Sequence, residues 1–233
     1  MISIPLLLTP AHECSYLAEQ TAQMVFVEPK FALTVEMYSQ LIAQGFRRSG
    51  DEVYAPHCQY CDQCLPARIA VNQFTATRTQ KRCLRKNATT QAVVKNATFN
   101  QAHYELYLRY QRSRHAEGLM AQASPEDYLR FMSSTWCQTQ FVEFSIADQL
   151  AGIAVVDVLH NAFSAVYTFF DPQFADYSLG TYAVLWQIQQ AKLQKREFVY
   201  LGFWIQACQK MNYKSHYHPL QILQQSQWLA INT

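Results

Sequence analysis

The chain has 233 residues, half of them apolar, and its 19 Lys and Arg nearly balance its 17 Asp and Glu. This length and composition predict a globular protein with one large domain or two small ones around a buried core. The longest apolar runs, residues 2–8 and 150–159, are far shorter than the roughly 18 to 20 residues that cross a bilayer, which excludes a membrane-spanning helix. No Lys or Arg precedes the first apolar run and Pro5 interrupts it, so we expect no secretory signal and a cytoplasmic protein.

The N-terminal part of the chain predicts one helix with a strand after it. Apolar side chains recur at helical spacing up to Gly45, a residue that suits the position just after a helix. Arg47 and Arg48 follow directly and place two guanidinium groups side by side. The predicted elements are, in order, an extended or irregular segment over residues 1–23, a helix over 31–45, a turn over 46–50 and a strand over 52–55.

Four of the seven cysteines form the next feature. Cys58, Cys61 and Cys64 follow one another at three-residue spacing, a pattern that lets thiolates converge on one soft metal ion. A tetrahedral zinc ion or an iron–sulfur cluster needs a fourth ligand, which either Cys14 or His57 would supply. The alternative is a set of reduced structural cysteines without an ion. An odd number of cysteines without a secretory signal argues against a disulfide framework.

A basic run follows over residues 78–86, with five Lys or Arg and no acid. Taken alone it is either a solvated helix face or a surface for a phosphate-rich partner. Strands are predicted on either side of it, over residues 67–71 and 89–95. The polar segment 96–100 then suggests a division of the chain into an N-terminal region, 1–98, and a C-terminal domain, 99–233.

The C-terminal part alternates helices with a run of strands. Ser124 and Pro125 precede two acids, which is the pattern of a capped helix start. Short polar connections between three apolar runs indicate an antiparallel meander. The predicted elements are helices over residues 102–116 and 124–135, strands over 140–146, 149–158 and 162–169, a helix over 181–195 and a strand over 198–201.

Residues 167–205 combine a strand, a tight turn, a helix and a further strand. The first amides of the helix that begins near Ser178 would face an anion or a developing oxyanion beyond the strand end. The order of elements is that of an α+β protein with a GNAT-like acyltransferase domain behind a small cysteine-bearing N-terminal α/β region. Gly180 is the only glycine in this turn, which argues against the phosphates of an acyl-CoA.

Beyond these patterns, the sequence resembles the arginyl-tRNA-protein transferase family of the N-degron pathway, and in particular its bacterial leucyltransferase branch. The resemblance spans nearly the whole chain and is specific because many short motifs occur in one order. These are Cys14-Ser-Tyr-Leu17, Gly45-Phe-Arg-Arg-Ser-Gly50, Pro56-His-Cys58, Pro66-Ala-Arg68-Ile69, Gln80-Lys-Arg82, Tyr167-Thr-Phe-Phe-Asp171-Pro172, Ser178-Leu-Gly-Thr181, Tyr200-Leu-Gly-Phe-Trp-Ile205 and Lys210-Met-Asn-Tyr-Lys214.

The resemblance implies an aminoacyltransferase that moves leucine from leucyl-tRNA to the N-terminal amino group of proteins that begin with Asp or Glu, marking them for degradation. It implies leucyl-tRNA and such proteins as partners, no cofactor for the chemistry itself, and a zinc ion or iron–sulfur cluster at the cysteines. We expect a monomer. The alternatives are transfer of arginine from arginyl-tRNA, an acyl-CoA-dependent N-acyltransferase, and a noncatalytic RNA-binding or metal-sensing module.

An aminoacyl ester is already activated, so the attacking amine needs no nucleophilic side chain from the protein. Orientation or deprotonation of the amine and stabilisation of the oxyanion are assigned to Asp171, Tyr167, Ser178, Gly180 and Thr181. The alternatives are purely structural: a turn residue for Asp171, a core aromatic residue for Tyr167 and a helix cap for Ser178. An acidic N-terminal side chain needs cations, for which the candidates are Arg47, Arg48, Lys210 and Lys214. The tRNA backbone is assigned to Arg78, Lys81, Arg82, Arg85 and Lys86.

Overall fold

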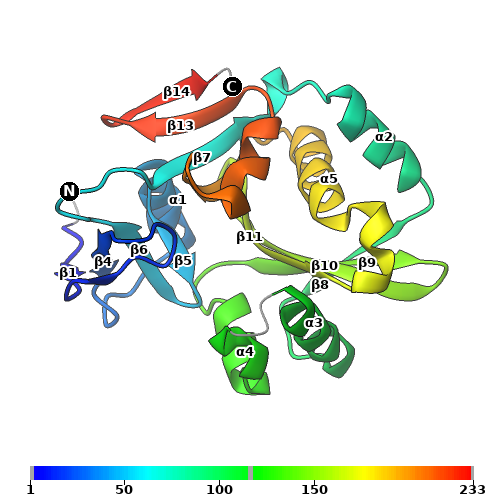
Figure 1. Ribbon diagram of the computed structural model, residues 1–233, viewed down its shortest axis with the longest axis horizontal. Helices are drawn as coiled ribbons and strands as arrows, with labels where there is room; N and C mark the ends of the chain where they lie inside the picture. The colour runs from blue at the N-terminus through cyan, green and yellow to red at the C-terminus, as the bar shows by residue number, and fades with distance from the viewer. Residues whose placement is uncertain (1–2, 115–117, 232–233) are drawn as a thin grey trace.

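The computed structural model describes residues 3–114 and 118–231 and shows an α+β protein built on one large mixed sheet (Figure 1). The eight strands of this sheet lie in the order β14-β13-β7-β12-β11-β10-β9-β8. All neighbours are antiparallel except β11 and β12, which are parallel. The strands are β7 Leu65–Ala70, β8 Gln91–Asn96, β9 Thr139–Ile146, β10 Gln149–Val158, β11 Ala162–Phe170, β12 Phe198–Trp204, β13 Leu220–Gln224 and β14 Gln227–Ile231.

Helices cover both faces of the large sheet, so its strands alternate between two apolar cores. On one face, α5 Leu179–Leu193 and α2 Arg78–Lys86 lie together, and on the other lie α3 Gln101–Arg114 and α4 Pro125–Met132 (Figure 1). The α5 core includes Phe144 and Val156, whereas Phe141 and Val155 face α3 and α4. Among the described residues no helix is long and apolar enough to cross a membrane.

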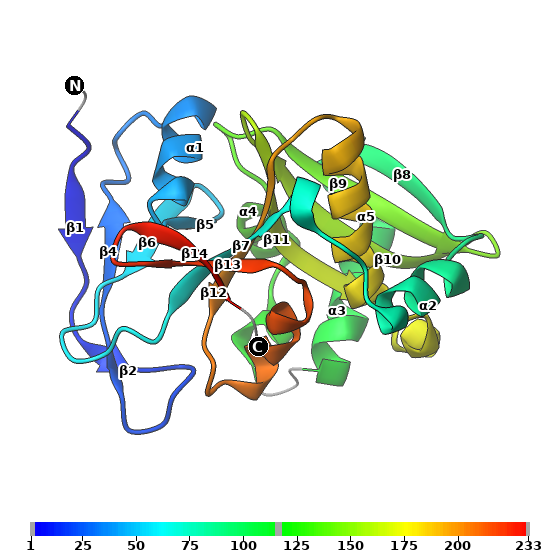
Figure 2. The ribbon, with the colours of Figure 1, turned by 90° about the horizontal axis from the view of Figure 1, so that it is seen from above.

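A second sheet and one helix make up most of the N-terminal part (Figure 2). The sheet has the order β1-β4-β6-β5, with β1 Leu6–Leu8, β4 Met24–Val27, β5 Arg47–Ser49 and β6 Glu52–Pro56. Helix α1 Val35–Ala43 begins at the Thr34 cap and packs Tyr38 and Leu41 into a third core, which also holds Tyr200 of β12. A two-stranded pair, β2 His12–Glu13 and β3 Thr21–Ala22, completes this part.

Most predicted elements are present, but several differ from the structure in their type or their ends. The turn predicted over residues 46–50 is wrong, because residues 47–49 form strand β5, which pairs with β6. The helix predicted over 124–135 ends at Met132, and the end predicted for the helix over 102–116 lies outside the described residues. The hairpin of β13 and β14 corresponds to no predicted element.

The two parts proposed for the chain share the large sheet. Strands β7 and β8 come from before residue 98, yet β7 lies between β12 and β13, and β8 forms one edge beside β9. The meander over β9, β10 and β11 is confirmed. The division at residue 98 stays a prediction.

Strands β11 and β12 separate after a short parallel stretch, and this separation shapes the centre of the molecule. They pair only from Ala162 to Ser164, after which β11 continues beside β10 and β12 continues beside β7. A bulge accompanies each departure: Val166 is the extra residue on β11, and Leu201 is the extra residue on β12. Bulges bend strands and free backbone groups from the ladder. A wedge-shaped gap therefore opens between the C-terminal halves of β11 and β12.

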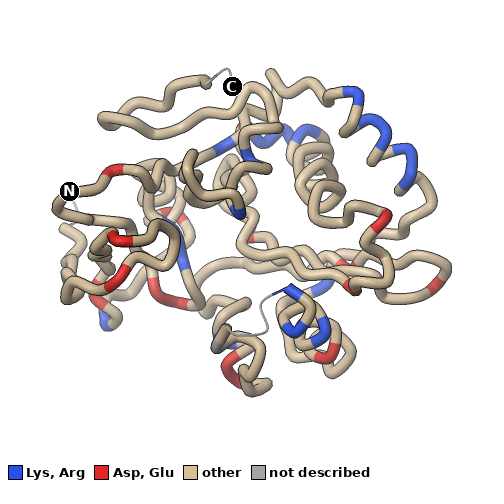
Figure 3. Tube along the Cα trace, in the orientation of Figure 1, with Lys and Arg blue, Asp and Glu red and all other residues tan. Residues whose placement is uncertain are grey.

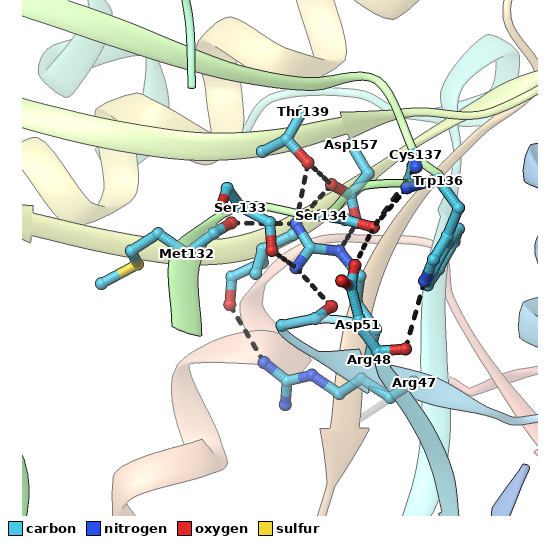
Figure 4. Close-up of polar contacts among 12 residues, drawn as sticks. Arg47, Arg48, Asp51, Met132, Ser133, Ser134, Trp136, Cys137, Thr139 and Asp157 are labelled. Carbon is cyan, nitrogen blue, oxygen red and sulfur yellow. Dashed lines mark hydrogen bonds and ion pairs between the residues drawn. The ribbon is translucent and has the colours of Figure 1, made fainter. Parts of the chain in front are cut away.

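A buried ion pair fastens strand β5 to the large sheet (Figure 4). Arg48 is 2% exposed and Asp157 of β10 is fully buried. The guanidinium donates Nε and Nη2 to the two carboxylate oxygens of Asp157, each over 2.6 Å. Its other donors bind the carbonyls of Gly50, Met132 and Ser133 and the hydroxyl of Thr139. The predicted role of Arg48 in gripping an acidic substrate is not supported, because every N–H of its guanidinium is used within the protein.

Removing one partner of the Arg48–Asp157 pair should strongly destabilise the protein. In Asp157→Asn the buried guanidinium keeps its charge but loses its carboxylate, and breaking such a pair costs about 3 to 5 kcal/mol. Urea unfolding followed by circular dichroism should show a free energy of unfolding lower by that amount. The matched control, Arg130→Gln, removes an exposed ion pair with Asp127 and should leave the unfolding midpoint almost unchanged. An Asp157→Asn variant as stable as the unmodified protein would contradict this account.

Candidate active site

Arg47 reaches from β5 into the gap between β11 and β12. Its Nη2 donates to the carbonyl of Val166, the bulge residue of β11, over 3.1 Å. On the other side of the gap lies Gly202 of β12, where an added Cβ would stand 2.6 Å from Nη1 of Arg47. Gly202 also has a φ of +74°, which glycine adopts without strain. Arg47 thus contacts both diverging strands, and no carboxylate pairs with it among the described residues.

Lys214 lies close to Arg47. It belongs to the 3-10 helix η4 Gln209–His216, is 4% exposed, and its Nζ donates to the carbonyl of Phe203 on β12. Burial, with a further contribution from the positive charge of Arg47, lowers the pKa of Lys214 to about 7. Two cations thus share a weakly solvated place at the gap, and among the described residues neither has an acidic partner. This arrangement favours binding of an anion that would supply the missing negative charge.

The four cations predicted to bind an acidic side chain therefore differ in their positions. Arg47 and Lys214 come together at the gap, while Arg48 is used within the core. Lys210 lies on η4 with an exposed side chain. Only the first two combine proximity, shielding from water and freedom from a carboxylate partner.

Asp171 lies at the end of β11 and is 8% exposed. Its Oδ2 accepts from Nε of Arg109 over 2.9 Å, and its Oδ1 accepts from the backbone amide of Gln173 over 3.1 Å. The second bond caps the 3-10 helix η3 Pro172–Tyr177, which is the turn role that the sequence offered as the alternative for this residue. Arg109 on α3 was not identified from the sequence, because no local pattern links it to a strand end 62 residues away.

The start of α5 differs from a standard capped helix. Ser178 has a left-handed backbone with φ of 53°, and its side chain makes no capping hydrogen bond, so it does not act as the side-chain cap that the sequence offered as its alternative role. Its carbonyl, together with that of Tyr177, lies instead near the thiol of Cys83 on α2. Gly180 faces the ring of Phe170 at the end of β11, where a Cβ would stand 3.6 Å from the ring. The first turn of α5 therefore lies beside the strand end that leads to Asp171.

Tyr167 follows the bulge residue Val166 on β11 and packs among aromatic rings of α3 and α4. Its ring lies 5.7 Å from that of Phe131 and 6.5 Å from those of Tyr107 and Tyr110. The hydroxyl accepts from Nε2 of Gln111 over 2.8 Å, and burial raises the pKa of Tyr167 to about 12. Gln111, fully buried, was not identified from the sequence. Tyr167 is therefore a neutral phenol near neutral pH.

The basic run forms helix α2, as predicted. Thr77 and Gln80 make a capping box at its start, and Gln80 also donates to the carbonyl of His216. All of its Lys and Arg side chains are exposed. Figure 3 shows their positions spread along the helix. The helix lies on the α5 face of the sheet, whereas β5, which carries Arg47, belongs to the other part of the molecule (Figure 1). The exposed basic residues of α2 are Arg78, Lys81, Arg82, Arg85 and Lys86.

The four predicted metal ligands line one cavity, which also includes His12 and Tyr16. Burial and the neighbouring thiols raise the pKa of Cys64 to about 12, as expected where thiols gather. Within residues 3–114 and 118–231, however, no three His, Cys, Asp or Glu side chains are arranged to hold a metal ion. Cys14, Cys58, Cys61 and Cys64 thus come together without forming a ligand set, and a zinc ion or iron–sulfur cluster stays a prediction.

Comparisons with known proteins match two segments of the chain. Residues 12–82 match the family model described as arginine-tRNA-protein transferase, N terminus, and residues 102–224 match its C-terminal counterpart. An aspartate/glutamate leucyltransferase of Teredinibacter turnerae is 45% identical over 100% of this chain and 96% of its own. One of Marinobacter nauticus is 43% identical over 97% of this chain and 95% of its own.

Among solved structures, FemX matches 86% of this chain and 80% of its own with 8% identity and a TM-score of 0.46. The family matches cover most of the chain, and the relatives are similar along their full length. The chain therefore belongs to the arginine-tRNA-protein transferase family, whose members are aminoacyltransferases.

Proposed function

We propose that this protein transfers leucine from leucyl-tRNA to the N-terminal amino group of proteins that begin with Asp or Glu. The single observation that carries the acceptor choice is the pair Arg47 and Lys214, two cations without a carboxylate at the gap between β11 and β12. The full-length similarity to proteins named aspartate/glutamate leucyltransferase supports leucine as the transferred group.

The acidic side chain of the acceptor binds between Arg47 and Lys214. Arg47 already donates one Nη2 bond to Val166, and its remaining N–H groups suit a carboxylate. Lys214 adds a second positive charge in a place where water is largely excluded, which strengthens the attraction. A neutral side chain at the same position would leave the charge of Arg47 without a counter-ion and would favour loss of the Lys214 proton, so the pair discriminates by charge.

The reaction is attack of the neutral α-amine on the ester carbonyl of leucyl-tRNA. A new C–N bond forms, the carbonyl oxygen carries negative charge in the tetrahedral intermediate, and the C–O bond to the ribose then breaks. The amine loses a proton and the departing ribose oxygen gains one, so the step balances without another reactant. Asp171 at the end of β11, together with the first turn of α5, is our candidate for placing the amine and the oxyanion.

We infer a GNAT-like arrangement from the way β11 and β12 diverge next to the α5 N-terminus. In that fold the gap between splayed strands receives an acyl donor. Here Arg47 lies in the gap and its guanidinium donates a hydrogen bond to the Val166 carbonyl. This occupation argues against the alternative of an acyl-CoA-dependent N-acyltransferase, as does the presence of a single glycine before α5.

The four gathered thiols remain our candidate site for a zinc ion or an iron–sulfur cluster. A bound cation would stabilise the thiolates and thereby lower the pKa that burial raises at Cys64. Elemental analysis of anaerobically purified protein tests for the metal. If zinc and iron are both substoichiometric, the proposed metal site is refuted.

Transfer assays with both donors test the proposed function directly. The protein should transfer leucine from leucyl-tRNA to peptides that begin with Asp or Glu, and it should transfer arginine from arginyl-tRNA more slowly. Peptides that begin with Ala should be poor acceptors because they leave Arg47 and Lys214 without a counter-ion. Equal transfer to Asp and Ala, or no transfer at all, would refute the proposal, and faster transfer of arginine would change the donor.

The same assay isolates Arg47. Arg47→Gln removes the charge that spans the gap, so its preference for Asp over Ala should fall about 10- to 100-fold, as when one partner of a shielded ion pair is lost. Lys210→Gln is the matched control, because it removes an exposed cation from η4 and should keep the preference.

Binding of acidic acceptors should weaken as the pH rises through about 7. The pKa of Lys214 without substrate is lowered to about 7. Above that pH the Lys214 side chain loses its proton and with it the positive charge that attracts an acidic side chain. Titration calorimetry with a peptide that begins with Glu and uncharged tRNA should show an affinity that drops up to about tenfold per pH unit above 7. Lys214→Arg should bind with little pH dependence, as should a Gln peptide. A pH-independent affinity for the Glu peptide would exclude this role.

Asp171→Asn should lower the transfer rate about 100-fold or more while tRNA binding stays within about twofold. The amide can still cap η3, so loss of the negative charge is the main change. Arg109→Gln is the companion variant: it keeps the carboxylate but removes its ion pair, and it should shift the pH profile of transfer. If both variants alter only the melting temperature, Asp171 has no part in the mechanism.

A further inference from the structure

A groove of about 190 Å³ lies between α2 and α5, on the face of the sheet away from α3 and α4. Its walls are apolar and come from Phe74, Leu84, Leu185 and Ile188. At its rim lie Gln189 and Lys192, which are exposed and one helical turn apart on α5. Phe74 is half-buried and packs against the main core, and its ring lies 6.4 Å from that of Tyr217. The groove therefore has a fixed aromatic wall and polar groups only at its mouth.

The surface beside this groove is strongly basic. Helix α2 forms one side of the groove through Leu84 and carries the five exposed basic residues of the run 78–86, whose positions along the helix are shown in Figure 3. Among the described residues none of these five takes part in an ion pair, and Lys192 adds another cation at the rim. A polyanion drawn to α2 would pass directly over the groove.

We propose that this groove binds an unpaired nucleobase of the tRNA. Apolar walls with one aromatic ring suit the two faces of a base, and the Gln189 amide can both donate to and accept from its edge. The Lys192 ammonium offers a further donor or a phosphate contact. A protein segment would need apolar side chains and would gain nothing from the surrounding positive charge. The inference rests on the proposed use of tRNA and adds to it a contact that does not depend on charge.

The two kinds of contact respond differently to salt, which makes them separable. Phosphate contacts release counter-ions, so the logarithm of affinity falls with the logarithm of salt concentration by about 0.9 per duplex phosphate contacted. Stacking of a base on an aromatic ring carries little of this dependence. A groove variant should therefore weaken binding equally at low and high salt, whereas an α2 variant should change the slope.

The test measures binding of uncharged leucine-accepting tRNA to the full-length protein between about 50 and 200 mM salt. Phe74→Ala removes the aromatic wall, and Ala76→Phe fills the groove, which Ala76 also lines, without deleting any contact. Each should weaken binding about 5- to 100-fold at every salt concentration with an unchanged slope. Phe99→Ala, an exposed aromatic residue that packs on Tyr104 of α3, is the matched control and should bind tRNA normally. Lys81→Gln should instead reduce the slope.

The outcomes distinguish this inference from the function on which it rests. Normal tRNA binding by Ala76→Phe, together with weaker binding by Lys81→Gln, would overturn the nucleobase site and leave the tRNA surface intact. Normal binding by Lys81→Gln and Arg85→Gln would count against the tRNA surface itself. If the groove variants raise the KM for the acceptor peptide and leave tRNA affinity unchanged, the groove binds protein and the inference is wrong. Thermal unfolding of each variant shows whether Phe74→Ala is folded, and Ala76→Phe answers the question if it is not.

Discussion

The early separation of β11 from β12 is the constraint on which the candidate site depends. Parallel neighbours that stay paired would leave no room between them, but these two share only three register positions. The bulges at Val166 and Leu201 turn each strand toward a different partner and leave the Val166 carbonyl without a ladder bond. Arg47 satisfies that carbonyl, and Gly202 leaves space for its guanidinium. The hydrogen bond from Arg47 to the Val166 carbonyl thus offsets the cost of opening the sheet, and it also places a cation between β11 and β12.

Arg47 and Arg48 are adjacent on one short strand but take different places in the structure. Successive side chains of a strand point to opposite sides, so two adjacent guanidinium groups on β5 cannot enter the same site. Arg48 enters the core and binds Asp157, while Arg47 turns into the gap. Because the Arg48 pair fixes the position of β5, it also fixes Arg47 against both β11 and β12. A loss at Arg48 would therefore affect acceptor binding through the position of its neighbour.

The sequence predicts repeating patterns well and long-range pairing poorly. The meander over β9 to β11, the helices α1, α2 and α5 and the gathering of four thiols follow from periodicity, caps and spacing. Residues 46–50 contain polar and glycine residues, which favour a turn locally, yet pairing with β6 makes a strand. Likewise no local signal joins Arg109 to Asp171, or Gln111 to Tyr167, because these contacts arise only when α3 packs on β11. Ser178 looked like a helix cap because serine is common there, but its left-handed backbone directs the side chain elsewhere.

The charges in the molecule are divided in a way that matches two different anions. Lys214 is buried, Arg47 is half-buried, and both are held by backbone carbonyls, so they act at short range and suit a single carboxylate. The cations of α2 are exposed, unpaired among the described residues and spread along a helix, so they act at longer range and suit a phosphate chain. In the proposed function, the separation of Arg47 and Lys214, on β5 and η4, from the cations of α2 keeps the acidic acceptor from competing with tRNA for the same cations. Both proposed substrates can then be bound at once, which a direct transfer between them requires.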